Sequence, residues 1–161
     1  MPARLYTVPI DNGAIAAASG DYELVELDPA TDKPIEICGW DFGQISEVQE
    51  AQEEQLRFAI ISGNTTVGTG GSSVTPVPIG NTADQASGFT ANILRTGIAT
   101  VGTATTRWAF AMPVRAGHQW GPVPEGFGFG HAGTGLIVIR LVAAVADDLT
   151  FQGSVLVREY S

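Results

Sequence analysis

The stretch LIVIRLVAAVADDLTFQGSVLVREY, residues 136–160, decides the fold. It is typical of two strands joined at residues 146–148. Successive side chains of a strand point to opposite faces, so a strand with one wet face alternates between apolar and polar residues. Residues 136–144 are apolar on both faces except for Arg140, which predicts a strand covered on both sides. Residues 149–158 do alternate. The inward face of this second strand would be formed by Leu149, Phe151, Val155 and Val157. A central strand beside a half-exposed one predicts a β-sandwich.

The rest of the chain repeats short alternating segments separated by turn residues. Its 161 residues include 20 glycines and 9 prolines, enough to punctuate many strands. Pro9 favours an edge position for the first strand, and Asp11-Asn12-Gly13 predicts a turn after it. The acidic segment 46–55 predicts an exposed loop or a single helical turn. We therefore expect one all-β domain over residues 1–161, a two-sheet antiparallel sandwich. It should be jelly-roll-like, with eight or nine strands and two long glycine-rich loops at 63–88 and 117–135.

Charge and composition argue against nucleic acid and membranes as partners. The 17 acidic and 8 basic residues give a net charge of −9, whereas a protein that coats nucleic acid needs a basic surface. No segment has the length of a membrane span, and the first residues lack the pattern of a signal peptide. The single cysteine excludes an internal disulfide. We expect a protein made in the cytoplasm that binds neither nucleic acid nor a membrane.

The residues that could perform chemistry are scattered. His118 and His131 are the only histidines and are not arranged as a His-x-His pair, so the sequence does not predict a metal site. Asp147-Asp148 favours an aspartate-rich turn over a calcium site. Cys38 lies in an apolar strand, where a small core residue is the ordinary interpretation. The sequence also lacks a Gly-x-Ser-x-Gly nucleophile motif. We therefore predict no catalytic residue, no cofactor and no metal.

Aromatic residues offer two open alternatives. In residues 126–130, glycine alternates with Phe127 and Phe129, so these rings either close the sandwich as a plug or contact another chain. Trp40, Trp108 and Trp120 could form a sugar-stacking platform. The apolar strands around Trp40 and Trp108 instead favour core positions for these two side chains.

Four segments carry a resemblance to a known family. They are AQEEQLR at 51–57, the Gly/Ser/Thr loop ending in TPVP at 75–78, ASGFTA at 86–91 and LTFQGS at 149–154. With these motifs the chain resembles small virion accessory proteins of tailed bacteriophages. The resemblance implies a jelly-roll-like head decoration or cement protein. Such a protein would bind the major capsid protein, often form a homotrimer, and have no catalytic residues.

Three functions follow from these observations. The first is a capsid decoration protein on the exterior of the virion, where a net charge of −9 is not repelled by packaged DNA. The second is a binding module of a phage tail or baseplate that contacts a host surface glycan, which an exposed aromatic cluster near Trp120 would favour. The third is a cupin-type enzyme, which metal analysis would test.

Two sets of residues are candidate contact sites. The face of the strand 136–144 that does not meet the sandwich core predicts a subunit interface through Leu136, Val138 and Val142, unless a loop such as 126–130 covers it. The N-terminal edge strand predicts a capsid-binding site at Arg4, Leu5 and Tyr6, because an edge can add to a neighbouring sheet. The loop 63–88 is the alternative anchor.

Overall fold

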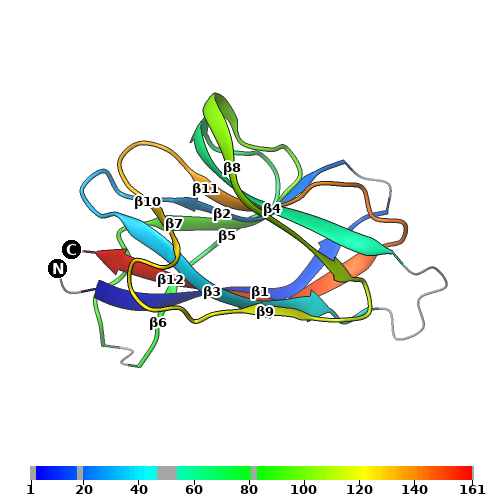
Figure 1. The fold of residues 1–161 in the computed structure, drawn as a ribbon, viewed down its shortest axis with the longest axis horizontal. Helices are drawn as coiled ribbons and strands as arrows, with labels where there is room; N and C mark the ends of the chain where they lie inside the picture. Colours follow the sequence, from blue (N-terminus) through cyan, green and yellow to red (C-terminus); the bar gives the residue numbers. More distant parts are fainter. Residues whose placement is uncertain (1–2, 18–19, 47–53, 81–82, 161) are drawn as a thin grey trace.

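The computed structural model describes residues 3–17, 20–46, 54–80 and 83–160 as two antiparallel sheets packed face to face (Figure 1). Sheet A has the strand order β10 (Phe129–His131), β3 (Ile35–Gln44), β12 (Leu149–Tyr160), β1 (Ala3–Ile15) and β6 (Val77–Pro78), with β9 (His118–Trp120) also paired to β3. Sheet B has the order β5 (Ser72–Val74), β7 (Thr90–Arg95), β2 (Tyr22–Asp28), β11 (Ile137–Leu141), β4 (Gln55–Thr66) and β8 (Thr100–Pro113). The predicted all-β sandwich is confirmed.

The strand pairing is that of a jelly roll. The first strand pairs with the last, β1 with β12, and the pairing continues inward with β2 to β11, β3 to β9 and β10, and β4 to β8. All of these pairs are antiparallel, and the nested pairs are divided between two sheets, as expected when a long strand pair is wrapped into a sandwich. Within the described ranges there are twelve strands instead of eight or nine. The difference comes from β5, β6, β9 and β10, which have only two or three residues each.

The stretch that predicted the fold is confirmed in part. All five residues of β11 are buried, and the strand lies between β2 and β4, so it is the expected central strand. The second strand, β12, buries the predicted inward residues. However, β12 lies in sheet A, so the segment 142–148 crosses from one sheet to the other (Figure 1). The prediction that the two strands are neighbours is wrong, because a jelly roll pairs each of them with an earlier strand.

The core between the sheets is rich in aromatic side chains. Trp40, Phe42, Phe58 and Phe151 are each at most 1% exposed. Phe58 stacks on Phe110 at 5.2 Å between ring centroids and meets Phe151 edge to face. Burial of each large apolar side chain contributes about 1.5–3 kcal/mol. This core fixes the spacing of the two sheets and therefore the positions of the loops at their edges.

Two local predictions need correction. Asp11-Asn12-Gly13 was expected to form a turn, but it is a bulge inside β1, where the register with β12 shifts and Asn12 adopts a φ of 49°. Residues 63–88 were expected to be irregular, but they contain β5 and β6 and the end of β4. The acidic segment predicted at 46–55 lies largely outside the described residues.

Candidate functional site

The side chains that could perform chemistry are engaged in packing. The ring of His118 accepts a hydrogen bond from the Trp40 indole at 2.9 Å, and burial lowers the pKa of His118. Burial also lowers the pKa of His131, and it raises the pKa of the Cys38 thiol. Among the described residues no three His, Cys, Asp or Glu side chains are grouped so that they could hold a metal ion.

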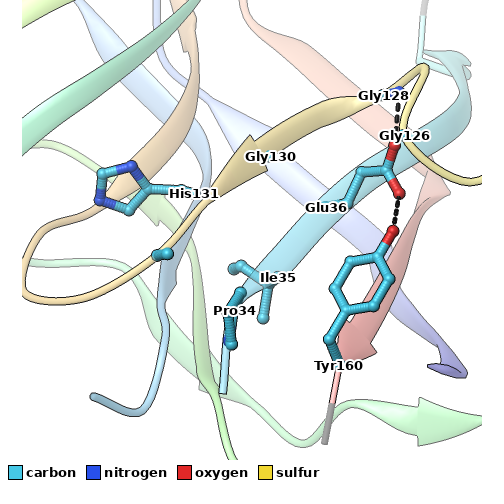
Figure 2. Close-up of a pocket in the computed structure, with 9 residues that line it drawn as sticks. Pro34, Ile35, Glu36, Gly126, Gly128, Gly130, His131 and Tyr160 are labelled. Atoms are coloured by element: carbon cyan, nitrogen blue, oxygen red, sulfur yellow. Dashed lines mark hydrogen bonds between the residues drawn. The ribbon is translucent and has the colours of Figure 1, made fainter. Parts of the chain in front are cut away.

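A pocket of about 340 Å³ lies beside β10, under the glycine-rich loop 124–128 (Figure 2). Its central charged group is Glu36, whose two carboxylate oxygens are fully occupied. Oε1 accepts a hydrogen bond of 2.5 Å from the Gly128 N–H, and Oε2 accepts hydrogen bonds from Arg158 at 2.7 Å and from the Tyr160 hydroxyl. In Figure 2 the His131 ring lies away from Glu36 and Tyr160, on the far side of β10. The pocket therefore does not bring an acid and a base together.

Glu36 holds this loop in place. Burial alone would raise the pKa of Glu36, but the hydrogen bonds from Tyr160, Arg158 and Gly128 outweigh it and lower the pKa. The carboxyl group is therefore ionised and bound to its donors at neutral pH. Gly128 is required at this contact, because a Cβ there would collide with the Ile37 carbonyl and the Glu36 side chain. We interpret the pocket as the space beneath a clamped loop.

The residues predicted as a subunit interface are covered by the chain itself. Leu136 and Val138 are 2% and 1% exposed, and they pack on the outer face of sheet B with Ala59, Ile61 and Ala99. Val142 is half-buried against the same cluster. The segment around Ala99 provides the cover, whereas residues 126–130 lie beside sheet A. This burial removes the physical reason for an interface at Leu136 and Val138. Whether the protein forms a trimer stays a prediction.

Two buried glutamates hold the segments that cover sheet B. Glu23 Oε1 accepts hydrogen bonds from the Ala99 N–H at 2.9 Å and from Arg140 at 2.8 Å. Glu26 accepts a hydrogen bond of 2.5 Å from the Gly68 N–H. Both carboxylates are completely buried. Burial raises the pKa of Glu23 and the neighbouring Glu26 adds to the effect, although Arg140 acts in the opposite direction.

A second pair of groups completes this cluster. Glu26 Oε1 accepts a hydrogen bond of 3.0 Å from Asn92, and it lies 3.4 Å from Nε of Arg95. Arg95 also donates to the Gly70 carbonyl at 2.6 Å. The backbone of Thr69 and Gly97 joins the two covering segments by hydrogen bonds in both directions. The cluster is therefore a structural fastening of two loops over sheet B.

The residues predicted to bind the capsid do not form an open edge. Tyr6 is fully buried, and its hydroxyl donates to the Gln85 carbonyl. The outer edge of β1 is paired with β6 at Tyr6 and Thr7, and the Ile79 N–H donates to the Leu5 carbonyl. Arg4 bonds to Gln85 at 2.6 Å. The edge at Arg4, Leu5 and Tyr6 therefore already bonds to residues of the loop 63–88, which was the alternative anchor. A strand of another protein would have to displace this loop.

The open side of the sandwich is lined by aromatic rings. We call this surface the aromatic edge; it consists of Trp108, Phe110, His118, Trp120 and Phe129, where β8 of sheet B faces β9 and β10 of sheet A. Ring centroids are separated by 4.4 Å for Phe110 and His118, 5.2 Å for Trp120 and Phe129, and 6.1 Å for Trp108 and Phe129. Trp108 is 52% exposed, so its predicted core position is wrong. The Trp108 side chain points to the inner face of sheet B, but β8 is the outermost strand, so one side of the ring is open to solvent.

The two phenylalanines of the glycine-rich loop have different environments. Phe129 packs against the core, whereas Phe127 is 76% exposed. The plug interpretation therefore holds for Phe129, and contact of Phe127 with another chain stays a prediction. Because Glu36 binds the Gly128 N–H, the loop that carries Phe127 is fixed at the neighbouring residue.

The strand β8 has a long unpaired edge. It extends over 14 residues and pairs only with β4 among the described strands. Most of its side chains are exposed. An edge of this length carries a row of unpaired N–H and C=O groups, which native proteins usually shorten, cover or charge. The aromatic edge and the open backbone of β8 together are the candidate functional site.

Comparison with known proteins gives no assignment, since no family model, curated protein or solved structure matches this chain. None of the described residues form a helix with the length and apolarity needed to cross a bilayer.

Proposed function

We propose that the protein is an accessory protein of a phage virion that decorates the exterior of the capsid. The observation that supports this proposal most directly is the open edge of β8, which is available for contact with another protein. The buried carboxylates of the described residues, by contrast, are engaged in fastening loops. Such a molecule is suited to binding a large surface. The resemblance of four segments to virion accessory proteins supports a capsid as this surface, and the charge of −9 favours its outside.

The experiment uses capsids assembled without this protein. Purified protein should bind these capsids and should raise the temperature or the osmotic stress at which they break. A lack of binding to capsids, with binding to isolated tails or host cells instead, would contradict the assignment to the head.

The homotrimer is part of the same proposal. Because Leu136 and Val138 are covered, a trimer contact would use other apolar side chains, of which Val77 and Ile79 are 42% and 41% exposed. Light scattering at micromolar concentration measures the mass directly. A monomer at that concentration would exclude the trimer.

A second function, binding of a host surface glycan, is favoured by a hollow on the outer face of sheet A. The hollow has a volume of about 410 Å³ and includes Thr7, Asp41, Gln119 and Ser154 in its lining, but no basic residue. Hydroxyl, amide and carboxylate groups are suitable partners for sugar hydroxyls. Titration with glycans of the host surface should then give saturable binding that Asp41→Ala weakens. An absence of binding to all of them would exclude this function.

A further inference from the structure

Two hydrogen bonds of β4 show which backbone N–H and C=O groups of β8 face β4 and which face outward. The Val114 N–H donates to the Glu54 carbonyl, so Glu54 on β4 faces β8. The Val142 N–H donates to the Arg57 carbonyl on the opposite side of β4. Backbone groups alternate along a strand, so Leu56, Phe58 and Ile60 also face β8. Their partners are Met112, Phe110 and Trp108.

It follows that Ala109 and Ala111 direct their N–H and C=O groups away from β4. Pro113 has the same outward direction, and a residue without an N–H is tolerated there because no ladder bond is lost. No described strand pairs with β8 on this side. Ala109 and Ala111 have small exposed side chains, so access to their backbone is not blocked by their own side chains.

The charge of the surrounding sequence is opposite to that of the whole molecule. Between Asp84 and Glu125 the chain contains three arginines and no acidic residue, whereas the complete chain has a net charge of −9. Two of these arginines, Arg107 and Arg115, are exposed near the two ends of the outward-facing segment. The open edge therefore favours an acidic ligand.

A second copy of this chain fits the edge poorly. If two β8 strands paired around a two-fold axis with Ala109 opposite Ala111, Arg107 would lie opposite Pro113 and two residues from Arg115 of the other copy. At this diagonal spacing two long side chains are still within reach of each other, so their like charges repel. An extended segment that places carboxylates beside Arg107 and Arg115 is instead attracted to them. An apolar side chain on its inner face would also cover the exposed half of Trp108.

We propose that the edge of β8 at residues 107–113 binds an extended, acidic segment of a partner protein by strand addition. The segment forms backbone hydrogen bonds with Ala109 and Ala111, places carboxylates toward Arg107 and Arg115, and packs an apolar residue on Trp108. This inference rests on the proposed function, which supplies a capsid protein as the partner, and it names the surface and the chemistry of the contact.

The test compares two substitutions at one position on capsids assembled without this protein. Ala109→Pro removes an outward N–H without removing a bond to β4, whereas Ala109→Gly retains the N–H and serves as the matched control. We expect Ala109→Pro to weaken capsid binding at least tenfold and Ala109→Gly to change it less than threefold. Arg107→Gln should weaken binding about threefold and reduce its dependence on salt.

Hydrogen exchange measures the same contact in the unsubstituted protein, so the test does not depend on the folding of the proline variant. The amides of Ala109 and Ala111 should become protected when capsids are added, whereas those of Phe110 and Met112 already bond to β4 and should change little. If the protein binds capsids without this protection, the strand-addition inference is wrong while the proposed function holds. If it does not bind capsids, the proposed function fails first. Protection that rises with the concentration of the isolated protein would identify a second copy as the ligand and overturn the inference.

Discussion

Replacing Glu36 with glutamine tests the clamp beneath the glycine-rich loop. The side chains of Glu36 and its partner Arg158 are 3% and 15% exposed, so the substitution leaves a largely buried guanidinium without its counter-charge. Removing one partner of a buried ion pair costs about 3–5 kcal/mol. Arg158 keeps its hydrogen bond to the Val123 carbonyl, so we expect the lower end, about 3 kcal/mol. For a chain of this size that corresponds to a decrease in Tm of about 6–12 °C.

The measurement is urea unfolding of the wild type, Glu36→Gln and the control Glu125→Gln. Glu125 is an exposed carboxylate of the same loop, so its substitution makes the same charge change without touching the clamp. The control should differ from wild type by less than about 0.5 kcal/mol.

The pH dependence provides an independent check on Glu36. Because folding lowers the pKa of Glu36 below its ordinary value of 4.5, its contribution to stability is complete above that pH. The contribution is lost as the pH falls through the folded pKa, where the protonated acid resembles glutamine. The difference between wild type and Glu36→Gln should therefore shrink on acidification. A difference below about 0.5 kcal/mol at pH 7, or one that stays constant well below pH 4.5, would refute the clamp.

Four further outcomes are expected. Val101→Gly should raise the free energy of unfolding by about 0.5–1 kcal/mol, because this exposed, β-branched residue has a φ of 60°; thermal unfolding measures it. Burial lowers the pKa of His118, so stability should fall as the pH drops below 6.5, and His118→Gln should flatten that slope in urea titrations. Trp108→Ala should cost much less stability than the about 3–5 kcal/mol of Phe58→Ala, because half of the indole is already in water. Val138→Asp should unfold the chain, seen by circular dichroism, rather than only separate subunits, because it buries an unpaired charge.

Alternation identified most of the strands because it reports the burial of each face. Tyr6, Val8 and Ile10 are fully buried as the first strand requires, and the covered faces of β11 were correctly expected. Alternation does not report which strand is the neighbour. It therefore placed β11 beside β12, although the two are in different sheets. It also placed Trp108 in the core, because an inward-facing residue on an edge strand has the same pattern as one in the centre.

The candidate site was harder to predict, since an unpaired edge is a property of the whole topology. Pro9 suggested an edge at β1, but the two-residue strand β6 pairs with that edge and carries no recognisable strand pattern. The longest open edge among the described strands is that of β8, which has the same alternation as the other strands. One signal was present in the sequence: the absence of acidic residues between Asp84 and Glu125. A segment without acidic residues in an acidic chain favours a negatively charged partner, which the rest of the surface would repel.

The acidic residues themselves explain how long glycine-rich loops are held in a chain with one cysteine. Four buried glutamates on strands each accept a hydrogen bond from the backbone N–H of a loop residue: Glu23 from Ala99, Glu26 from Gly68, Glu36 from Gly128 and Glu159 from Gly88. Three of the four donors are glycines, and at Gly68 and Gly128 a Cβ would collide with the backbone or with the carboxylate.

This repeated contact separates the acidic residues into two roles. The buried glutamates on strands fasten loops, and the exposed carboxylates place negative charge on the surface. Hydrogen bonds from a backbone N–H to a carboxylate are stronger than those between neutral groups. These contacts hold the loops without a disulfide. Among the described strands, β8 has the longest edge that no other strand covers, and there Ala109 and Ala111 direct backbone groups that can form new hydrogen bonds.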